Sequence, residues 1–448
     1  MASFKINIQR LADSLITGRW DREALQSRLT RSLLDSLPDP KRLVARLLFH
    51  FDEKSPPTRS QLISFLLGDE QIRQALEVIK GRPGPRILLD PPVMGSLPDN
   101  MTTFPLPQLA TSKDLQQWLC LLDYELAWFA DIEGRQHKVI EPKRHHYRYN
   151  WLVKPSGKNR LIEIPKSRLK AIQRQLLSEL LNRVPPHPSA HGFRRHRSCL
   201  TFVAPHVGKE VVMRMDLKDF FHSVPTPRIT ALFQRLGYPR RVARLLQGLC
   251  THATSPLLAG TPYQSLSWDK RKLLQFKHLS QGAPTSPAIA NLCAWRLDCR
   301  LKGAAERFGL EYTRYADDLA FSGSAKLMHS ASFLQGLVGA IAMDEGFAIN
   351  HRKTRLHTRS QCQRLAGMVL NEKPNPPRRE FDQLKATLFN CIRFGPDTQN
   401  RAGHRDYKSH LAGRIAYIGW LNPSKGERLR ALWERIVWPE SSPHSQVR

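Results

Sequence analysis

The 448-residue chain contains no long apolar run. Crossing a bilayer as a helix takes roughly 18–20 consecutive apolar residues, and no stretch approaches that length, so no membrane association is expected. The first residues, Met1 to Asn7, lack the pattern of a secretory signal, which makes the cytoplasm the expected location. The seven cysteines are scattered, odd in number and without CxxC spacing. That usage argues against a disulfide framework and against a zinc site.

Acidic residues are scarce relative to basic ones, with 39 Asp+Glu against 69 Lys+Arg and a formal net charge of +30. Such an excess indicates a polyanionic partner. The excess is unevenly distributed, because residues 1–100 hold 15 Lys+Arg and 12 Asp+Glu, a net of +3. The remaining charge of +27 therefore falls on residues 101–448.

The first 80 residues show apolar positions at helical spacing in several short segments, separated by turn and capping residues such as Pro38-Asp39-Pro40. We predict a small helical accessory domain at residues 1–81. Its near-neutral charge makes contact with a protein as reasonable as contact with RNA. Residues 82–107 are rich in Pro and Gly and are the predicted linker. Helical periodicity resumes over 112–130, which predicts one amphipathic helix.

The stretch Arg314 to Phe321 (RYADDLAF) predicts a β-hairpin with two adjacent carboxylates, Asp317 and Asp318, at its tip. Adjacent acids repel each other and are tolerated when a hard divalent cation such as Mg²⁺ binds between them. The alternative is an Asp-Asp turn on a solvated surface.

A second carboxylate site lies about a hundred residues upstream, where the apolar run 211–215 predicts a buried strand that ends at Asp216. Asp219 competes for the same role, but it lies three residues further on and is expected to face solvent. Between the acidic sites, residues 279–287 (LSQGAPTSP) form a Gly/Pro/Ser turn that leads into a helical pattern. Such a loop lets the backbone approach a ligand closely.

Two strand-like pieces, 151–154 and 160–165, flank a turn with several cations and predict a basic hairpin. The planar guanidinium of Arg160 suits phosphate oxygens, and Lys154 and Lys158 support it less firmly. A solvated basic hairpin is the alternative. Residues 189–198 gather basic groups around an aromatic, as contacts with a nucleic-acid backbone would favour.

The three motifs, in their order and spacing, resemble those of the reverse transcriptases. Residues 350–354 resemble the family segment that carries a Lys, and 365–371 resemble its primer-gripping hairpin. The resemblance covers roughly residues 104–436 and implies an α+β right-hand polymerase. Fingers are then expected at 108–210, the palm at 211–372 with an insertion at 225–278, and a helical thumb with a C-terminal tail at 373–448.

The resemblance also implies roles for individual residues. Asp216, Asp317 and Asp318 would bind two Mg²⁺ ions and catalyse nucleotidyl transfer. Around the incoming dNTP, Phe221 would exclude a 2′-hydroxyl, Gln281 would contact the nucleotide, Lys353 would protonate the leaving pyrophosphate, and Arg160 with Lys158 would bind the triphosphate. For Phe221 the alternative is a core aromatic, and for Lys353 a solvated lysine.

Residues 189–198 also resemble retron and group II intron enzymes, and 201–209 resemble a retron-specific segment that keeps His206. Phe202, Val203 and Leu365-Ala366 depart from the usual retron residues. The expected function is RNA-directed DNA synthesis of retron type, in which a dedicated structured RNA serves as template and primer for a short DNA in phage defence. An effector protein would dock on the N-terminal domain. The alternatives are a non-retron defence polymerase with untemplated or protein-primed synthesis, and an RNA-binding scaffold like the intron maturases.

Overall fold

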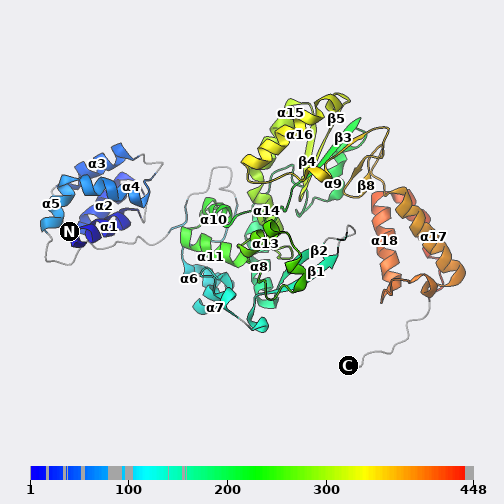
Figure 1. The fold of residues 1–448 in the computed structure, drawn as a ribbon, viewed down its shortest axis with the longest axis horizontal. Coiled ribbons are helices and arrows are strands. Elements are labelled where there is room, and N and C mark those ends of the chain that lie inside the picture. The colour runs from blue at the N-terminus through cyan, green and yellow to red at the C-terminus, as the bar shows by residue number, and fades with distance from the viewer. Residues whose placement is uncertain are drawn as a thin grey trace. The chain divides into compact units, whose positions relative to one another are not determined.

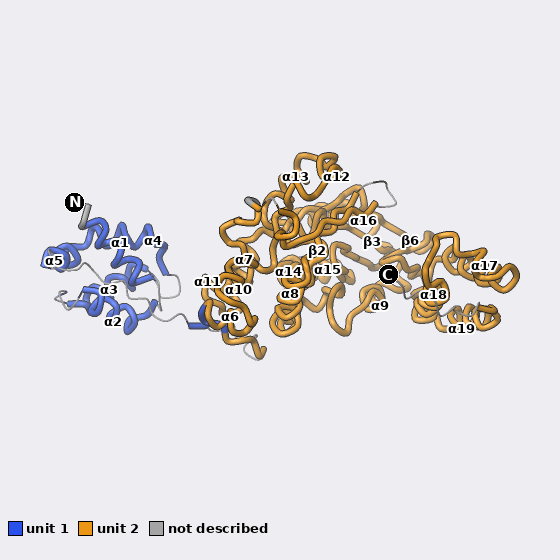
Figure 2. The backbone as a smooth tube through the Cα atoms, turned by 90° about the horizontal axis from the view of Figure 1, so that it is seen from below, with its two compact units in different colours: residues 1–95, 109–111 blue, residues 96–108, 112–448 orange. Residues whose placement is uncertain are grey.

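The computed structural model describes residues 2–16, 20–33, 37, 39–51, 56–78, 93–95, 104–139, 141–153, 157 and 159–438. Figure 2 shows its two compact units, one of residues 1–95 and 109–111 and the other of residues 96–108 and 112–448. Most of the predicted linker, 82–107, lies outside the described residues. Among the described helices, none combines the length and apolarity that a bilayer crossing demands.

The first unit is helical wherever it is described in detail. Its helices are α1 Ala2–Ile16, α2 Arg22–Leu33, α3 Pro40–His50, α4 Arg59–Gly68 and α5 Glu70–Val78. Their leucine-rich faces form one buried core. Thr58 starts α4 with a capping box, in which its hydroxyl accepts from the Gln61 backbone and the Gln61 side chain accepts from the Thr58 backbone. The short helices expected from the leucine spacing are confirmed.

The second unit begins with two helices where one was predicted. Helix α6 spans Ser112–Leu119 and α7 spans Asp123–Ala130. The chain reverses at Cys120, whose φ of +50° is left-handed, and the Glu125 carboxylate accepts from the Leu122 backbone N–H to cap α7. The prediction of one helix over 112–130 is therefore wrong, and Leu122, which lies between the two helices, is 58% exposed.

The predicted basic hairpin is confirmed as an antiparallel pair of strands, β1 Tyr147–Val153 and β2 Asn159–Pro165. Lys154 and Lys158 lie outside the described residues. Helices α8 Ser167–Glu179 and α9 Cys199–Val203 follow.

A four-stranded antiparallel sheet forms the centre of the second unit. It comprises β3 Val211–Asp216, β4 Glu311–Tyr315, β5 Asp318–Gly323 and β6 Arg355–Thr358 in the order β4-β5-β3-β6. Side chains alternate between the two faces of a strand, so Arg214, Asp216 and Asp318 share one face. Helices α15 Trp295–Arg307 and α16 Lys326–Asp344 pack beside β4 and β5 (Figure 1).

The remaining elements are mainly helices. The predicted insertion contains α10 Thr226–Arg235, α11 Arg240–Cys250, α12 Thr261–Gln264 and α13 Trp268–Gln275, and α14 Ser286–Cys293 follows the Gly/Pro/Ser turn. The expected hairpin at 365–371 is present as β7 Arg364–Leu365 and β8 Met368–Val369. Helices α17 Arg378–Phe394, α18 Tyr407–Leu421 and α19 Pro423–Trp433 then share a separate core. The predicted mixture of helix and sheet is confirmed.

Candidate active site

The turn between β4 and β5 places two carboxylates at one end of the sheet. Tyr315 pairs with Asp318, so Ala316 and Asp317 form a two-residue turn. Two-residue hairpin turns require left-handed backbone, and Ala316 has a φ of +55°. The predicted hairpin is thus confirmed, with an acid in its turn and another at the start of β5.

Arg314, which is fully buried, holds this turn through hydrogen bonds. Arg314 donates to both carboxylate oxygens of Asp298, with Nε–Oδ1 and Nη2–Oδ2 distances of 2.8 and 2.6 Å. Its Nη1 also donates to the Ala316 carbonyl at 3.1 Å and to Asn291 Oδ1 at 2.9 Å. Because Asn291 belongs to α14, one side chain connects the carboxylate turn to the helix that follows the Gly/Pro/Ser turn.

The loop around Gly192 covers the turn from the other side. A Cβ at Gly192 would lie 2.6 Å from the Ala316 nitrogen, so only glycine allows this approach. The His191 N–H donates to the Arg314 carbonyl at 2.8 Å, and the Asn291 amide donates to the Gly192 carbonyl at 2.8 Å. The carboxylate turn is held by the Arg314 side chain on one side and by the backbone around Gly192 on the other.

Asp216 ends β3 directly opposite Asp318, and the Leu217 N–H donates to the Asp317 carbonyl at 2.8 Å. The three predicted carboxylates therefore occupy neighbouring positions, at the end of one strand, in the turn, and at the start of the next strand. Their side chains are largely shielded, with 5% of Asp216 and 18% of Asp318 exposed.

The surroundings of Asp317 and Asp318 disfavour negative charge. Burial, followed by the charges of Asp216 and Asp318, raises the pKa of Asp317. Burial also raises the pKa of Asp318, although the charge and hydrogen bonds of Arg214 oppose that rise. Arg214 forks onto Asp318, with Nε 2.9 Å and Nη2 2.7 Å from Oδ1.

Two residues just before β6 contact Asp216. Lys353 Nζ donates to Asp216 Oδ1 at 2.7 Å, and the Asn350 amide donates to Oδ2 at 3.2 Å. The sequence prediction included Lys353 but missed Asn350 and Arg214. A signal for Arg214 was present, because it is a charged residue in an apolar strand and lies two positions before Asp216, on the same face.

Three crowded carboxylates, of which Asp317 and Asp318 have raised pKa values, form a donor set that a hard divalent cation would stabilise. The residues present therefore fit a metal site. Asp216 and Asp318 here face Lys353 and Arg214. Within the described part of the chain, a different trio, Glu163, His222 and His278, brings potential ligand atoms within 4.8 Å of one another.

That trio is a buried hydrogen-bonded cluster. His278 places Nδ1 2.8 Å from the Phe276 carbonyl and Nε2 2.8 Å from Glu163 Oε2. Both ring nitrogens of His278 therefore lie within hydrogen-bond distance of an oxygen. Burial alone would raise the pKa of Glu163, but interactions with His278, with smaller contributions from His252 and His222, lower it to about 2.

The cluster positions the loop of Gln281. The Glu163 N–H donates to the Gln281 carbonyl at 2.9 Å, and a Cβ at Gly282 would lie 2.6 Å from the Glu163 carbonyl. The sequence analysis missed this role. The sequence feature that could have indicated it is the alternation of side chains along β2, which places Glu163 on the same buried face as Leu161 and Pro165.

A cleft of about 610 Å³ brings most of the predicted site residues together. Its lining includes Asp216, Asp317, Arg160, Phe221, Gln281 and Lys353. Asp318 is not among the lining residues, since it faces Arg214. Lys158 lies outside the described residues.

Two residues near Phe220 also lie at this cleft, Phe221 and Asp219. Phe220 is the core aromatic of the pair, at 3% exposed, whereas Phe221 is half-buried in the cleft wall with its ring 6.0 Å from that of Phe193. The expectation that Asp219 faces solvent is wrong, because it lines the cleft and forms an ion pair with Lys270 of α13. A left-handed φ of +51° at Asp219 turns it back toward the cleft.

Residues 152–380 match the family model described as reverse transcriptase (RNA-dependent DNA polymerase). Since the match covers about half of the chain, the chain belongs to the reverse transcriptase family. It is a retron-type member, similar to two curated enzymes of Myxococcus xanthus. Identity to the retron Mx65 reverse transcriptase is 40% over 295 residues, which is 65% of this chain and 65% of that enzyme. Identity to the retron Mx162 reverse transcriptase is 34% over 345 residues, which is 73% of this chain and 67% of that enzyme.

Among solved structures, a telomerase from Candida tropicalis in complex with a fragment of telomeric RNA aligns with 61% of this chain and 54% of its own, at 11% identity and a TM-score of 0.36. This likeness is too distant to define the fold. The family match and the mixed helix and sheet content of the second unit fit a polymerase fold.

Proposed function

We propose that this chain is a retron-type RNA-directed DNA polymerase that copies a dedicated structured RNA into a short DNA. One observation carries the proposal: Asp216, Asp317 and Asp318 occupy neighbouring positions at one end of a sheet, and the first two line a cleft together with Arg160 and Gln281. Membership of the reverse transcriptase family supports the reaction, and the net charge of +27 outside the first 100 residues supports a nucleic-acid partner.

The proposed roles follow from the positions of the residues at the end of the sheet and in the cleft. Asp216, Asp317 and Asp318 would hold two Mg²⁺ ions. When bound, these ions would activate the primer hydroxyl and stabilise charge on the transferred phosphate. Arg160 binds the triphosphate of the incoming dNTP, since a guanidinium fork matches phosphate oxygens.

Three further residues complete the proposed site. Phe221 borders the sugar and excludes a 2′-hydroxyl, because its ring fills the cleft wall. Gln281 contacts the nucleotide from a loop that Glu163 holds through its backbone. Lys353, now paired with Asp216, is placed to donate a proton to the leaving pyrophosphate.

The parts of the polymerase are proposed from the family match. We assign 108–210 as fingers, 211–372 as palm with the helical insertion 225–278, and 373–448 as thumb and tail. The helices of the first unit would form an accessory module for an effector protein in phage defence. Family membership is the support for these assignments.

Primer extension tests the proposal. Purified protein with Mg²⁺, dNTPs and a primed RNA should extend the primer with sequence complementary to the template. The double substitution Asp317→Asn with Asp318→Asn should abolish extension. Asp344→Asn, which removes an exposed carboxylate of a surface ion pair with Arg300, is the matched control and should leave extension intact. Extension that survives in the double variant would refute the assigned chemistry. Product sequences unrelated to the template would favour untemplated synthesis.

A further inference from the structure

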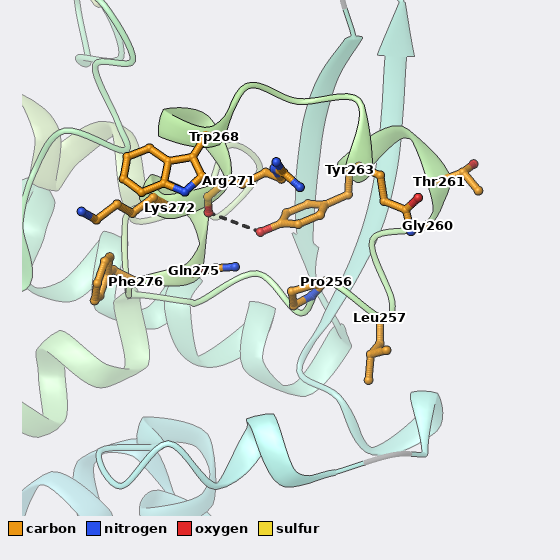
Figure 3. Close-up of a pocket in the computed structure, with 11 residues that line it drawn as sticks. Pro256, Leu257, Gly260, Thr261, Tyr263, Trp268, Arg271, Lys272, Gln275 and Phe276 are labelled. Atoms are coloured by element: carbon orange, nitrogen blue, oxygen red, sulfur yellow. Dashed lines mark hydrogen bonds between the residues drawn. The ribbon is translucent and has the colours of Figure 1, made fainter.

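A second pocket, of about 810 Å³, lies beside α12 and α13 in the helical insertion (Figure 3). It shares no lining residue with the catalytic cleft. Its lining comprises Pro256, Leu257, Gly260, Thr261, Tyr263, Gln264, Trp268, Arg271, Lys272, Gln275 and Phe276. This set contains two cations, three aromatic rings and no carboxylate, so the pocket attracts a negatively charged ligand that has a flat apolar part.

The cations of the pocket are available to a ligand. Lys272 Nζ lies 4.8 Å from the centroid of the Trp268 ring, and Figure 3 shows Lys272 between the rings of Trp268 and Phe276. Arg271 Nε is buried and has no hydrogen-bond partner among the described residues. Within the same described part of the chain, no ion pair involves Arg271 or Lys272. A buried donor without a partner is uncommon and suggests a missing acceptor.

Two of the three rings of the pocket are exposed, whereas Tyr263 is buried. Trp268 is 65% exposed and Phe276 66% exposed, and Leu257 beside them is also largely exposed. Large aromatic side chains normally bury most of their surface, so neighbouring exposed rings indicate a contact surface. Base stacking uses this combination of exposed rings and cations.

The pocket is built rigidly onto the β1–β2 hairpin. Tyr263 and Leu274 share a small core with Leu161 of β2. Trp151 of β1 donates from Nε1 to the Ala259 carbonyl at 2.7 Å. The Tyr263 hydroxyl donates to the Arg271 carbonyl at 3.3 Å, the bond dashed in Figure 3. The segment that forms the pocket therefore packs on the hairpin that also carries Arg160.

Helix α13 separates the pocket from the catalytic cleft and contributes to both. Lys270 and Leu274 line the cleft, whereas Trp268, Arg271 and Lys272 line the pocket. A nucleic-acid strand that enters the cleft needs to cross only this helix to reach the exposed rings.

We propose that this pocket binds an unpaired segment of the RNA that the enzyme uses, with a base stacked on Trp268 or Phe276 and the adjacent phosphate held by Arg271 and Lys272. The proposal rests on the proposed function for the identity of the strand. RNA is favoured over a protein partner because the rings are interleaved with cations, no carboxylate lines the pocket, and the unit carries a large positive charge.

Binding of defined RNAs tests the proposal separately from catalysis. The probes are an end-labelled single-stranded oligoadenylate of roughly eight nucleotides, a usual footprint for single-strand sites, and a fully paired RNA duplex. Fluorescence anisotropy with the full-length protein gives both affinities. Trp268→Ala should weaken oligoadenylate binding by about 5- to 150-fold, the loss expected for one stacked base, and should change duplex binding little. Trp268→Phe keeps a ring and should retain most of the affinity.

Phe276→Ala and Phe333→Ala form a matched pair, because both rings are 66% exposed and Phe333 lies on α16, outside the pocket. Only Phe276→Ala should weaken oligoadenylate binding. A photoreactive nucleotide in the oligoadenylate should crosslink to residues of α13. Unchanged affinity in both Trp268→Ala and Phe276→Ala, or equal losses for oligoadenylate and duplex, would overturn the proposal. Extension of a preannealed primer by these variants reports on the proposed polymerase function independently.

Discussion

The buried Arg314–Asp298 pair provides the sharpest test of how the carboxylate turn is held. Both side chains are fully buried and two hydrogen bonds join them. Replacing Arg314 by Met keeps the volume but leaves the Asp298 carboxylate buried without a countercharge. Breaking one side of a buried pair costs about 3–5 kcal/mol. The entropy of unfolding is about 2.1 cal/mol/K per residue, so for a unit of about 350 residues the melting temperature should fall by roughly 4–7 °C.

The double variant Arg314→Met with Asp298→Leu separates the charge from the packing. Removing both charges is often neutral, so most of the lost stability should return. Recovery should fall short by about 1 kcal/mol, because the Tyr312 hydroxyl also donates to Asp298 and loses that acceptor. Primer extension by this folded double variant should remain low, because the Ala316 carbonyl has lost the hydrogen bond from the Arg314 side chain.

Calorimetry and chemical unfolding of the three proteins measure these differences. A loss of less than about 1 kcal/mol for Arg314→Met would refute the buried-charge reasoning. So would a double variant as unstable as the single one. Full activity in the stable double variant would show that Arg314 stabilises the fold without positioning the turn.

Two further predictions concern pH and metal. The raised pKa of Asp317 means that its ionised form destabilises the metal-free fold, and that this cost disappears as pH falls through the folded pKa. Asp317→Asn should therefore raise the melting temperature without metal at neutral pH and reduce the increase that Mg²⁺ produces, measured by thermal shift; a lower melting temperature would contradict this. Burial, followed by the charges of His191 and Lys209, lowers the pKa of His206 from 6.5 to about 3. The stability that neutral His206 contributes is therefore complete above pH 6.5 and is lost as pH falls from there toward 3. His206→Gln should flatten that decline in unfolding experiments; an unchanged decline would show that other groups cause it.

The elements that the sequence predicted well are those fixed by local pattern. The hairpin around Asp317 and the strand that ends at Asp216 follow from apolar runs interrupted by acids, and the register of the sheet then places the acids together. The Gly/Pro/Ser turn before α14 follows from its composition in the same way. Each prediction needed only the residues of its own segment.

The features that the sequence analysis missed depend on contacts between distant segments. The buried Glu163 carboxylate has its hydrogen-bond partner in His278, 115 positions later. Arg214 is a charged residue in an apolar strand, and its partner Asp318 belongs to another strand, 104 positions later. No Gly or Pro marks the break between α6 and α7 in the sequence, because Cys120 occupies the left-handed position.

Two buried pairs of hydrogen-bonded side chains help to keep the site organised. Arg314–Asp298 holds the carboxylate turn and α14, and Glu163–His278 holds the loop of Gln281, which precedes α14. A buried pair contributes little net stability compared with an apolar pair of the same volume. Its hydrogen bonds, however, allow only one arrangement of the backbone groups that it contacts. We therefore infer that these pairs are positioning devices: together they fix the carboxylate turn and the proposed nucleotide loop before substrate enters, which is the geometry that electrostatic preorganisation requires.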